Sequence, residues 1–468
     1  MTKIGLEIHC QLTKLESKLF CSCKANYRGF ESNTNICPVC TGLPGSLPRL
    51  NKKAIEKATI IAMALNCKTP PKIAFFRKNY FYPDLPKNFQ ITQLNLYGPT
   101  SIGQEGKISI EGKEIQIRRI QLEEDPGRLI YEGSSERTQI TLVDYNRAGT
   151  PLVEIVTEPD FENPKQVRLF LNILSDLLEN LGVSDPSLEG AMRADANVSI
   201  EGGSKVEIKN INSFYDLEKA LQFELTRQHS LADRSIGIIQ ETRHWDERRK
   251  ITVSARSKEG EEDYRYFLEG DIPWITIPTQ VISMLKKDMP ESISSKRERY
   301  IKDFDIPTQV ADVLSSDKFY SDLFEQSHNK TNAKEVSNLI TTDLMGFVDT
   351  KEKRKKSKLT AKHLSDLANA IIANKITRNS SKTILQTIVN NGKSVAQMIS
   401  ELDFGHVLDE TELSKIIDDI IKEESKAVEE ARQKPETINY LVGKIMKKTK
   451  GNADPSLTLN LLKKKISK

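Results

Sequence analysis

The chain has 468 residues, too many for one ordinary domain, so we expect two to four domains. Its 38% hydrophobic and 29% charged residues are typical of a soluble globular protein, and no uncharged apolar run is long enough to span a bilayer. The N-terminal segment lacks the apolar core of a secretory signal, and six cysteines are too few for a secreted disulfide framework of this length. These features predict a cytoplasmic protein with no membrane contact.

The formal net charge of +4 is unevenly distributed along the chain. Residues 440–468 carry eight lysines and one aspartate, so the remainder of the chain is slightly acidic. A basic tail on a near-neutral body predicts a polyanion partner at that end, and a solvated lysine-rich helix end is the alternative. The candidate contacts for the polyanion are Lys444, Lys447, Lys448 and Lys450.

Residues 4–9 (IGLEIH) alternate apolar and polar side chains, which predicts a β-strand with one buried face. Leu6 and Ile8 would then point into the core, while Glu7 and His9 share the opposite face. A carboxylate and an imidazole side by side could form half of a metal site. Taken alone, the hexapeptide favours a simpler interpretation, a half-exposed edge strand with a polar outer face.

Four cysteines follow as two close pairs separated by a 13-residue loop. Such spacing is typical of a tetrahedral zinc site, which with four thiolates has no open position and is therefore structural. The predicted zinc ligands are Cys21, Cys23, Cys37 and Cys40.

Residues 51–66 have helical spacing and a possible Asn51 N-cap. Residues 77–84 (RKNYFYPD) then combine cations with three consecutive aromatic residues. This composition suits a site that stacks a base and binds a phosphate, although an aromatic-rich core loop has the same composition. The candidates are Lys78, Tyr80 and Tyr82.

Residues 94–142 contain short alternating runs broken by glycines, which predicts hairpins of an antiparallel sheet. An acidic cluster at 123–127 ends in a turn signal. Glu154 then lies within the apolar run 152–156, where an unpaired carboxylate would be costly and therefore requires a cation or a metal. Glu154 is the first feature to count against the edge-strand interpretation of Glu7 and His9.

Further along, residues 164–181 predict a helix capped by Asn163, and residues 192–200 and 206–212 predict paired strands. From about residue 285 helical spacing dominates, and 351–358 (KEKRKKSK) are expected to form a solvated linker. We therefore predict an α+β protein. A mixed α/β domain with a largely antiparallel sheet would span 1–285, an all-helical domain 286–397 and a small helical tail domain 398–468.

Familiar catalytic motifs are missing from the sequence. Residues 392–394 (GKS) resemble the end of a phosphate-binding P-loop, but Thr387 stands where that loop requires a glycine. The sequence also has no HExxH motif. If an enzyme with this sequence handles a nucleotide, it does so without a P-loop, and a metal held by carboxylates must do more of the phosphate binding.

The motifs taken together resemble the B subunit of the tRNA-dependent amidotransferases, which is GatB of the GatCAB complexes. The matching stretches run in the family's order over nearly the whole chain and are most specific in the first 270 residues. They are IGLEIH (4–9), RKNYFYPD (77–84), EEDPG (123–127), NRAGTPLVEIVTEPD (146–160), RADANVSI (193–200), EIKNINSF (207–214), QETR (240–243), DYRYF (263–267) and VGKIMKKTKGNADP (442–455).

The resemblance implies an ATP- and Mg²⁺-dependent enzyme with a cradle-shaped catalytic domain. It would phosphorylate the side-chain carboxylate of Glu or Asp misattached to tRNA, and ammonia from a glutaminase would then displace the phosphate. The glutaminase (A) and a small third member (C) complete a heterotrimer, and the helical and tail domains engage the tRNA. By similarity, the family's metal-binding positions are Glu7, His9, Glu124 and Glu154.

Further residues are candidates for lining the same cradle, namely Arg193, Asp195, Lys209 and Asn210. A histidine ligand leaves Mn²⁺ as an alternative to Mg²⁺. Two other functions stay open: a non-catalytic, zinc-stabilised tRNA-binding scaffold, and a GatE-like archaeal protein specific for Glu-tRNA(Gln). The sequence does not indicate whether Glu-tRNA(Gln), Asp-tRNA(Asn) or both is the substrate.

Overall fold

The computed structural model describes residues 2–131, 140–209, 211, 213–256, 261–401, 410–433, 437–449, 453 and 455–466. The chain divides into two compact units, Met1–Pro290 and Glu291–Lys468. The first unit is a mixed α/β domain and the second is helical, which confirms the predicted α+β class. No helix among the described residues is both long and apolar enough to cross a membrane.

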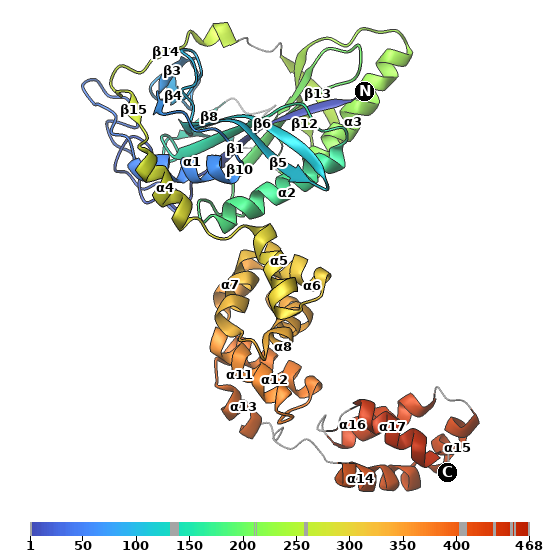
Figure 1. Ribbon diagram of the computed structural model, residues 1–468. Helices are drawn as coiled ribbons and strands as arrows, with labels where there is room; N and C mark the ends of the chain where they lie inside the picture. The colour runs from blue at the N-terminus through green and yellow to red at the C-terminus, as the bar shows by residue number, and fades with distance from the viewer. Residues whose placement is uncertain are drawn as a thin grey trace. The chain divides into compact units, whose positions relative to one another are not determined.

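The first unit is built around an eight-stranded sheet (Figure 1). Apart from the parallel β11–β12 pair, its strands run antiparallel to their neighbours, as the sequence predicts. In spatial order the strands are β13 (Ile251–Arg256), β12 (Glu241–Asp246), β11 (Val206–Lys209), β10 (Met192–Ser199), β1 (Lys3–Gln11), β9 (Pro151–Thr157), β6 (Lys113–Glu124) and β5 (Gly103–Ile110).

The opening strand β1 lies in the middle of this sheet, hydrogen-bonded to β10 on one side and β9 on the other. The edge-strand interpretation of residues 4–9 is therefore wrong. Leu6 and Ile8 are buried in the main core, as predicted. Glu7 and His9 project from the opposite face of a strand whose backbone is hydrogen-bonded on both sides and therefore held rigidly.

Three helices cover the core face of the sheet: α1 (Lys52–Ala64), α2 (Pro164–Asn180) and α3 (Phe214–Asp233). Both predicted caps form, since the Asn51 and Asn163 side chains accept hydrogen bonds from Ala54 and Gln166 amides. On α2 the apolar stripe that includes Phe170 and Leu174 is fully buried, and each such side chain contributes about 1.5–3 kcal/mol.

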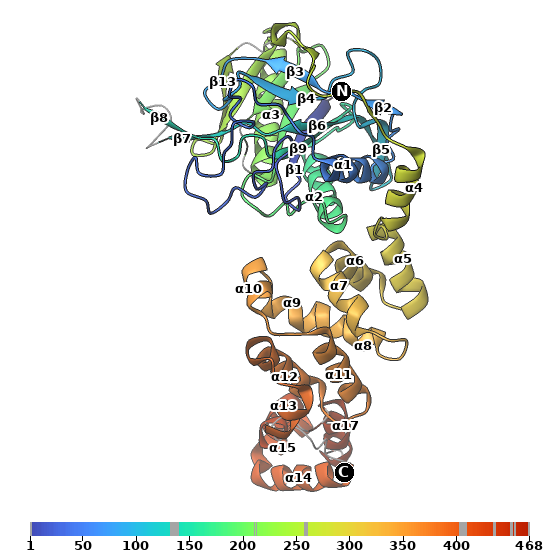
Figure 2. The same ribbon diagram turned by 90° about the vertical axis from the view of Figure 1, so that its left-hand side faces the viewer.

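Three small sheets complete the first unit: β14 (Phe267–Leu268), β3 (Phe76–Asn79) and β4 (Phe89–Thr92); β15 (Ile275–Thr276) with β2 (Lys72–Ile73); and β7 (Arg128–Tyr131) with β8 (Thr141–Asp144). Figures 1 and 2 show β3 and β4 over the face of the main sheet opposite α1 and α2. The segment that carries Lys78 and Tyr80 therefore lies over the face of the sheet from which Glu7 and His9 project.

The first unit ends after α4 (Thr279–Asp288), a few residues beyond the predicted boundary at 285. Ile282 and Met289 pack against its core, which explains why this last helix belongs to the α/β unit.

The elements described in the second unit are all helices, and its buried apolar side chains form two clusters, one from Tyr300 to Met398 and one from Leu413 to Ile466. A division into two domains near residue 398 stays a prediction. The helices are α5 (Ile293–Phe304), α6 (Thr308–Ser316), α7 (Lys318–Ser327), α8 (Ala333–Asn338), a π-helical segment (Leu339–Leu344), α9 (Met345–Phe347), α10 (Lys351–Lys356), α11 (Ala361–Ile372), α12 (Arg378–Asn391), α13 (Val395–Glu401), α14 (Glu410–Glu423), α15 (Ser425–Gln433), α16 (Ile438–Lys448) and α17 (Pro455–Ile466).

The basic run at 351–358 is not a solvated linker. Residues Lys351–Lys356 form helix α10, and Arg354 pairs with Asp317 at 2.7 Å. The Arg354 guanidinium also lies 4.5 Å from the centre of the Tyr320 ring. This ion pair and cation–π contact tie the segment to the helical unit, which charge patterning alone does not reveal.

Candidate active site

Strand register brings the predicted carboxylates and histidine to one face of the sheet. His9 lies opposite Glu154 on β9 and opposite Arg193 on β10, while Glu7 lies opposite Asp195. Residues opposite each other on neighbouring strands present their side chains to the same face. Glu154, Arg193 and Asp195 are therefore adjacent to His9 or Glu7 as a consequence of backbone pairing.

These side chains form the floor of a cavity of about 460 Å³. The predicted residues Glu7, His9, Lys78, Tyr80, Glu154, Arg193 and Lys209 all line it. Asp195 is beside it, with its carboxylate 3.5 Å from the Lys209 ammonium. Tyr82 instead lines a neighbouring cavity, and Asn210 lies outside the described residues.

The fourth predicted metal ligand is displaced by one residue. Glu123, not Glu124, lies beside His9, with its Oε1 3.8 Å from His9 Nε2; Glu154 Oε1 is 4.0 Å from the same nitrogen. Consecutive side chains on a strand point to opposite faces, so β6 can direct only one of the two glutamates into the cavity. Assigning Glu124 to the His9 cluster is therefore wrong in this structure.

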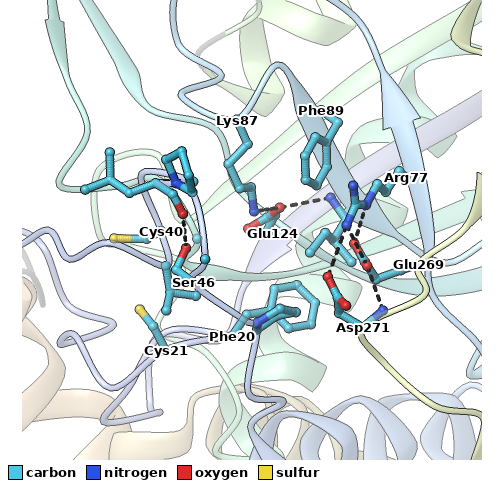
Figure 3. Close-up of a pocket in the computed structure, with 18 residues that line it drawn as sticks. Phe20, Cys21, Cys40, Ser46, Arg77, Lys87, Phe89, Glu124, Glu269 and Asp271 are labelled. Carbon is cyan, nitrogen blue, oxygen red and sulfur yellow. Dashed lines mark hydrogen bonds and ion pairs between the residues drawn. The ribbon is translucent and has the colours of Figure 1, made fainter.

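Glu124 lines a different, smaller pocket of about 220 Å³ (Figure 3). Its carboxylate pairs with the Lys87 ammonium and accepts a 2.9 Å hydrogen bond from the Ile91 amide. In the same pocket Arg77 pairs with Glu269, with a donor–acceptor distance of 2.7 Å. The acidic residues Glu124 and Glu269 are thus each neutralised by a neighbouring cation.

The carboxylates around His9 are less well compensated. Burial and the nearby Glu154 raise the pKa of Glu123 to about 8, although a 2.9 Å hydrogen bond from Thr92 partly opposes this. Burial also raises the pKa of Glu154, against the effect of Arg119. Burial, followed by Arg193, lowers the pKa of His9 to about 3, so its imidazole is neutral and can act as a ligand.

Cations surround this acidic centre and are held in place by hydrogen bonds. Arg193 donates a 2.8 Å hydrogen bond to the buried Asp125, which also accepts one of 2.6 Å from Gln11. Burial opposes ionisation of Asp125, but Arg193 and Arg147 outweigh it and keep the pKa of that carboxyl below its usual value. An ionised Asp125 orients Arg193 towards the cavity beside His9.

The donor set suits a hard divalent cation by its chemistry, although among the described residues only the four cysteines have ligand atoms that all lie within 4.8 Å of one another. Glu7, Glu123 and Glu154 offer carboxylate oxygens, and His9 offers a neutral nitrogen, which is compatible with Mg²⁺ or Mn²⁺ together with water or phosphate ligands. The Glu7 carboxylate accepts a 3.1 Å hydrogen bond from Asn197, whose own amide oxygen is buried without a partner. That orphaned oxygen is a further potential ligand for a cation, or for its bound water, on this face.

Sequence reasoning missed three contributors to this floor: Glu123, Gln121 opposite Glu154, and Asn197. Gln121 is identified by register alone, since it pairs across β6 and β9 with Glu154. The pair Glu123 and Glu124 was visible in sequence, but the face of each residue depends on a register shift in β6 between Ile117 and Arg119.

Among the described residues, four cysteine sulfurs converge most closely: those of Cys21, Cys23, Cys37 and Cys40 lie within 4.8 Å of one another. Sulfurs bound to one tetrahedral zinc at about 2.3 Å would be separated by about 3.8 Å, so the cluster fits such an ion after a small contraction. The cluster can hold a metal ion, as its spacing predicts.

Hydrogen bonds within the protein hold the cysteine loops in place. The Asn35 side chain bridges to Lys24, accepting from its amide at 3.2 Å and donating to its carbonyl at 2.9 Å. The Cys37 amide points at Cys40 Sγ from 3.2 Å. A hydrogen bond from the Cys21 thiol and the nearby Lys18 ammonium lower the pKa of Cys40 to about 4, giving it thiolate character.

Lys18 itself is fully buried. Its ammonium donates to the Asn35 carbonyl at 2.9 Å and contacts Cys40 Sγ at 3.6 Å. A buried ammonium needs a compensating negative charge, and the Cys40 sulfur is the anionic group that it contacts. Lys18 is therefore placed to offset negative charge on the cysteine cluster.

Comparison with known proteins identifies the family of this chain. A family model described as the GatB/GatE catalytic domain matches residues 2–283, and one described as the GatB domain matches residues 322–466. This chain belongs to the GatB family. The catalytic match contains both the His9 cavity and the four cysteines.

Three similar proteins are each named as the B subunit of aspartyl/glutamyl-tRNA(Asn/Gln) amidotransferase. The one from Saccharolobus solfataricus is 44% identical over 469 residues, covering 100% of this chain and 99% of the relative. The one from Sulfolobus acidocaldarius is 45% identical over 470 residues and covers 100% of both chains. The one from Thermotoga petrophila is 40% identical and covers 98% of each.

The predicted tail contacts lie in the region matched by the GatB domain. Lys444 and Lys448 on α16 pair with Glu424 and Glu423, at 2.9 and 2.8 Å. Part of the tail's basic charge is therefore neutralised within the tail itself. Lys450 lies outside the described residues, and tRNA binding by Lys444, Lys447 and Lys448 stays a prediction.

Proposed function

We propose that this chain is the ATP-dependent amidating subunit of a tRNA amidotransferase. Its substrate is Glu-tRNA(Gln), Asp-tRNA(Asn) or both, and its partners are the two other members of the complex, a glutamine-hydrolysing one (A) and a small one (C). The observation that carries the proposal is the cavity above Glu7, His9, Glu123 and Glu154, in which buried and partly buried carboxylates lie among several cations. Its position in a region similar to the GatB/GatE catalytic domain supports this function.

The chemistry explains why both signs of charge are needed. A side-chain carboxylate oxygen attacks the γ-phosphorus of ATP, the bond to the β-phosphate oxygen breaks, and ADP leaves. Ammonia then attacks the acyl carbon of the acyl phosphate, the carbon–oxygen bond breaks, phosphate leaves, and a proton is lost from nitrogen. A bound divalent cation would neutralise charge on the transferring phosphoryl group.

The residues of this chain have separate parts in that sequence. Glu7, Glu123, Glu154 and His9 would hold the Mg²⁺ or Mn²⁺. Lys78, Arg193 and Lys209 would bind phosphate oxygens and stabilise the charge that develops on them. Asp125 would keep Arg193 in position through their 2.8 Å hydrogen bond. We further propose that the four cysteines hold a structural Zn²⁺, because four thiolates leave no position for a substrate.

A non-catalytic scaffold accounts poorly for these features. A scaffold would have no need for carboxylates whose ionisation is opposed by burial and by each other. The GatE-like alternative gains no support, since the Saccharolobus and Sulfolobus relatives are named as B subunits and match the full chain.

The test is a transamidation assay with this chain, its A and C partners, glutamine, ATP and Mg²⁺. Glu-tRNA(Gln) and Asp-tRNA(Asn) are offered separately, and the amino acid released from tRNA is identified. We expect Gln or Asn and a stoichiometric amount of ADP. Binding of both tRNAs without ATP-dependent amide formation would support the scaffold instead.

A further inference from the structure

A second cavity of about 890 Å³ adjoins the His9 cavity within the first unit. The two share four lining residues: Lys78, Tyr80, Lys209 and Tyr264. The chain leaves strand β3 at Asn79 and continues through Tyr80 and Phe81 to Tyr82 along the second cavity. Any ligand part bound there is therefore next to the proposed site of phosphoryl transfer.

This second cavity combines exposed aromatic rings with cations. Phe81 is 77% exposed and Tyr82 51% exposed, so both present faces to solvent that a folded core would normally cover. Tyr80 and Tyr264 pack edge to face at 5.7 Å, and the Lys78 ammonium lies 4.5 Å from the centre of the Tyr264 ring. Lys209 and Arg265 add positive charge, against the acidic Asp84 and Asp263.

Aromatic faces interleaved with cations are the usual surface for unpaired nucleotides, whose bases stack while their phosphates meet positive charge. The proposed reaction requires such a ligand nearby. In a glutamyl ester only about five bonds of roughly 1.5 Å separate the terminal ribose oxygen from the reacting carboxyl carbon. In the proposed reaction the terminal nucleotide of the tRNA must therefore lie directly beside the His9 cavity.

We propose that the second cavity binds the unpaired 3′-terminal nucleotides of the aminoacyl-tRNA, with Phe81 and Tyr82 as stacking surfaces. This inference rests on the proposed function. Lys78 and Lys209, which line both cavities, mark the boundary between the tRNA strand and the phosphates of ATP. The ATP phosphates lie above Glu123 and Glu154. A solvent-exposed stacking surface suits a strand that enters from outside, whereas a small ligand is normally enclosed over most of its surface.

The test uses the assembled complex and the double variant Phe81→Ala/Tyr82→Ala. The matched control is Tyr215→Ala on α3, a tyrosine with the same 51% exposure as Tyr82 that lines neither cavity. Initial rates of amide formation are measured with tRNA varied at saturating ATP, and with ATP varied at saturating tRNA. We expect KM for aminoacyl-tRNA to rise about tenfold or more in the double variant, with KM for ATP unchanged.

A binding measurement separates stacking from catalysis. Deacylated tRNA with and without its three 3′-terminal nucleotides is titrated into the complex, and fluorescence anisotropy gives the two Kd values. The wild type should bind the intact tRNA more tightly, and the double variant should lose most of that difference. Tyr215→Ala should preserve it.

Two results would overturn the assignment. A rise in KM for ATP alone would assign the aromatic surface to the adenine of ATP, and no change in any constant would remove the nucleotide site altogether. Wild-type complex that forms no amide on either tRNA would instead refute the proposed function, and this is seen before any variant is measured.

Discussion

Glu123 and Glu124 are neighbours in the chain, yet they belong to two electrostatically different regions. Glu124 faces Lys87, and the same pocket pairs Glu269 with Arg77. Glu123 faces Glu154 and a neutral His9, and its pKa is raised to about 8 by burial and by Glu154. Charge is balanced on one side of β6 and less well compensated on the other, and carboxylates perturbed in this way are concentrated at functional sites.

The largest expected effect on activity comes from a substitution in the His9 cavity. Glu154→Ala should reduce ATP-dependent amide formation by about 10²–10³-fold or more, because it removes a carboxylate proposed to hold the metal. Glutamine hydrolysis by the partner glutaminase should stay measurable in the same complex. Normal amide formation by Glu154→Ala would refute the metal assignment at this position.

The next test compares the two glutamates by stability. Glu124→Gln should lower the free energy of unfolding by about 3 kcal/mol, because it leaves the buried Lys87 ammonium without its counter-ion. Glu123→Gln should lower it much less, or raise it in metal-free buffer, since it relieves repulsion with Glu154. Both values come from urea unfolding of the chain followed by circular dichroism.

That comparison has a clear contrary outcome. If Glu123→Gln proved more destabilising than Glu124→Gln in the absence of divalent cations, the His9 region would be a structural charge network. The double variant Lys87→Met/Glu124→Leu serves as the control, and it should recover part of the stability lost in Glu124→Gln.

A smaller effect is expected at the cysteine cluster. Lys18→Met should release bound zinc to a chelator about tenfold faster than the wild type, because the thiolates lose a buried compensating charge. Lys18→Arg retains the charge and should lie between the two. The readout is zinc content and the time course of release with a colorimetric chelator. Equal release rates for Lys18→Met and the wild type would leave Lys18 with a packing role.

The smallest effect concerns the tail. Lys447→Ala should weaken tRNA binding modestly and lower the slope of log Kd against log salt by about one. Lys286→Ala on α4, an exposed lysine of the first unit, is the control and should leave the slope unchanged. An unchanged slope for Lys447→Ala would remove this residue from the predicted tail contacts.

Much of the fold could be predicted from sequence because its signals are local. Caps and apolar spacing defined α1 and α2, alternation defined β1 and β10, and an apolar run defined β9. The paired cysteines were equally readable, since their ligand spacing lies within one loop. The basic helix α10 was misjudged as a linker because the ion pair between Arg354 and Asp317 joins residues far apart in the chain.

The sequence by itself determined which residue types the site contains: Glu7 and His9 on one strand face, and Glu154 in an apolar strand that required a partner. Only the tertiary structure decided which glutamate joins them, because the face of Glu123 follows from the pairing of β6 with β9 and its register shift. The central position of β1 was likewise invisible locally. Alternation identifies a buried face, whereas neighbours on both sides come from strands about 150 and 190 residues away in the chain.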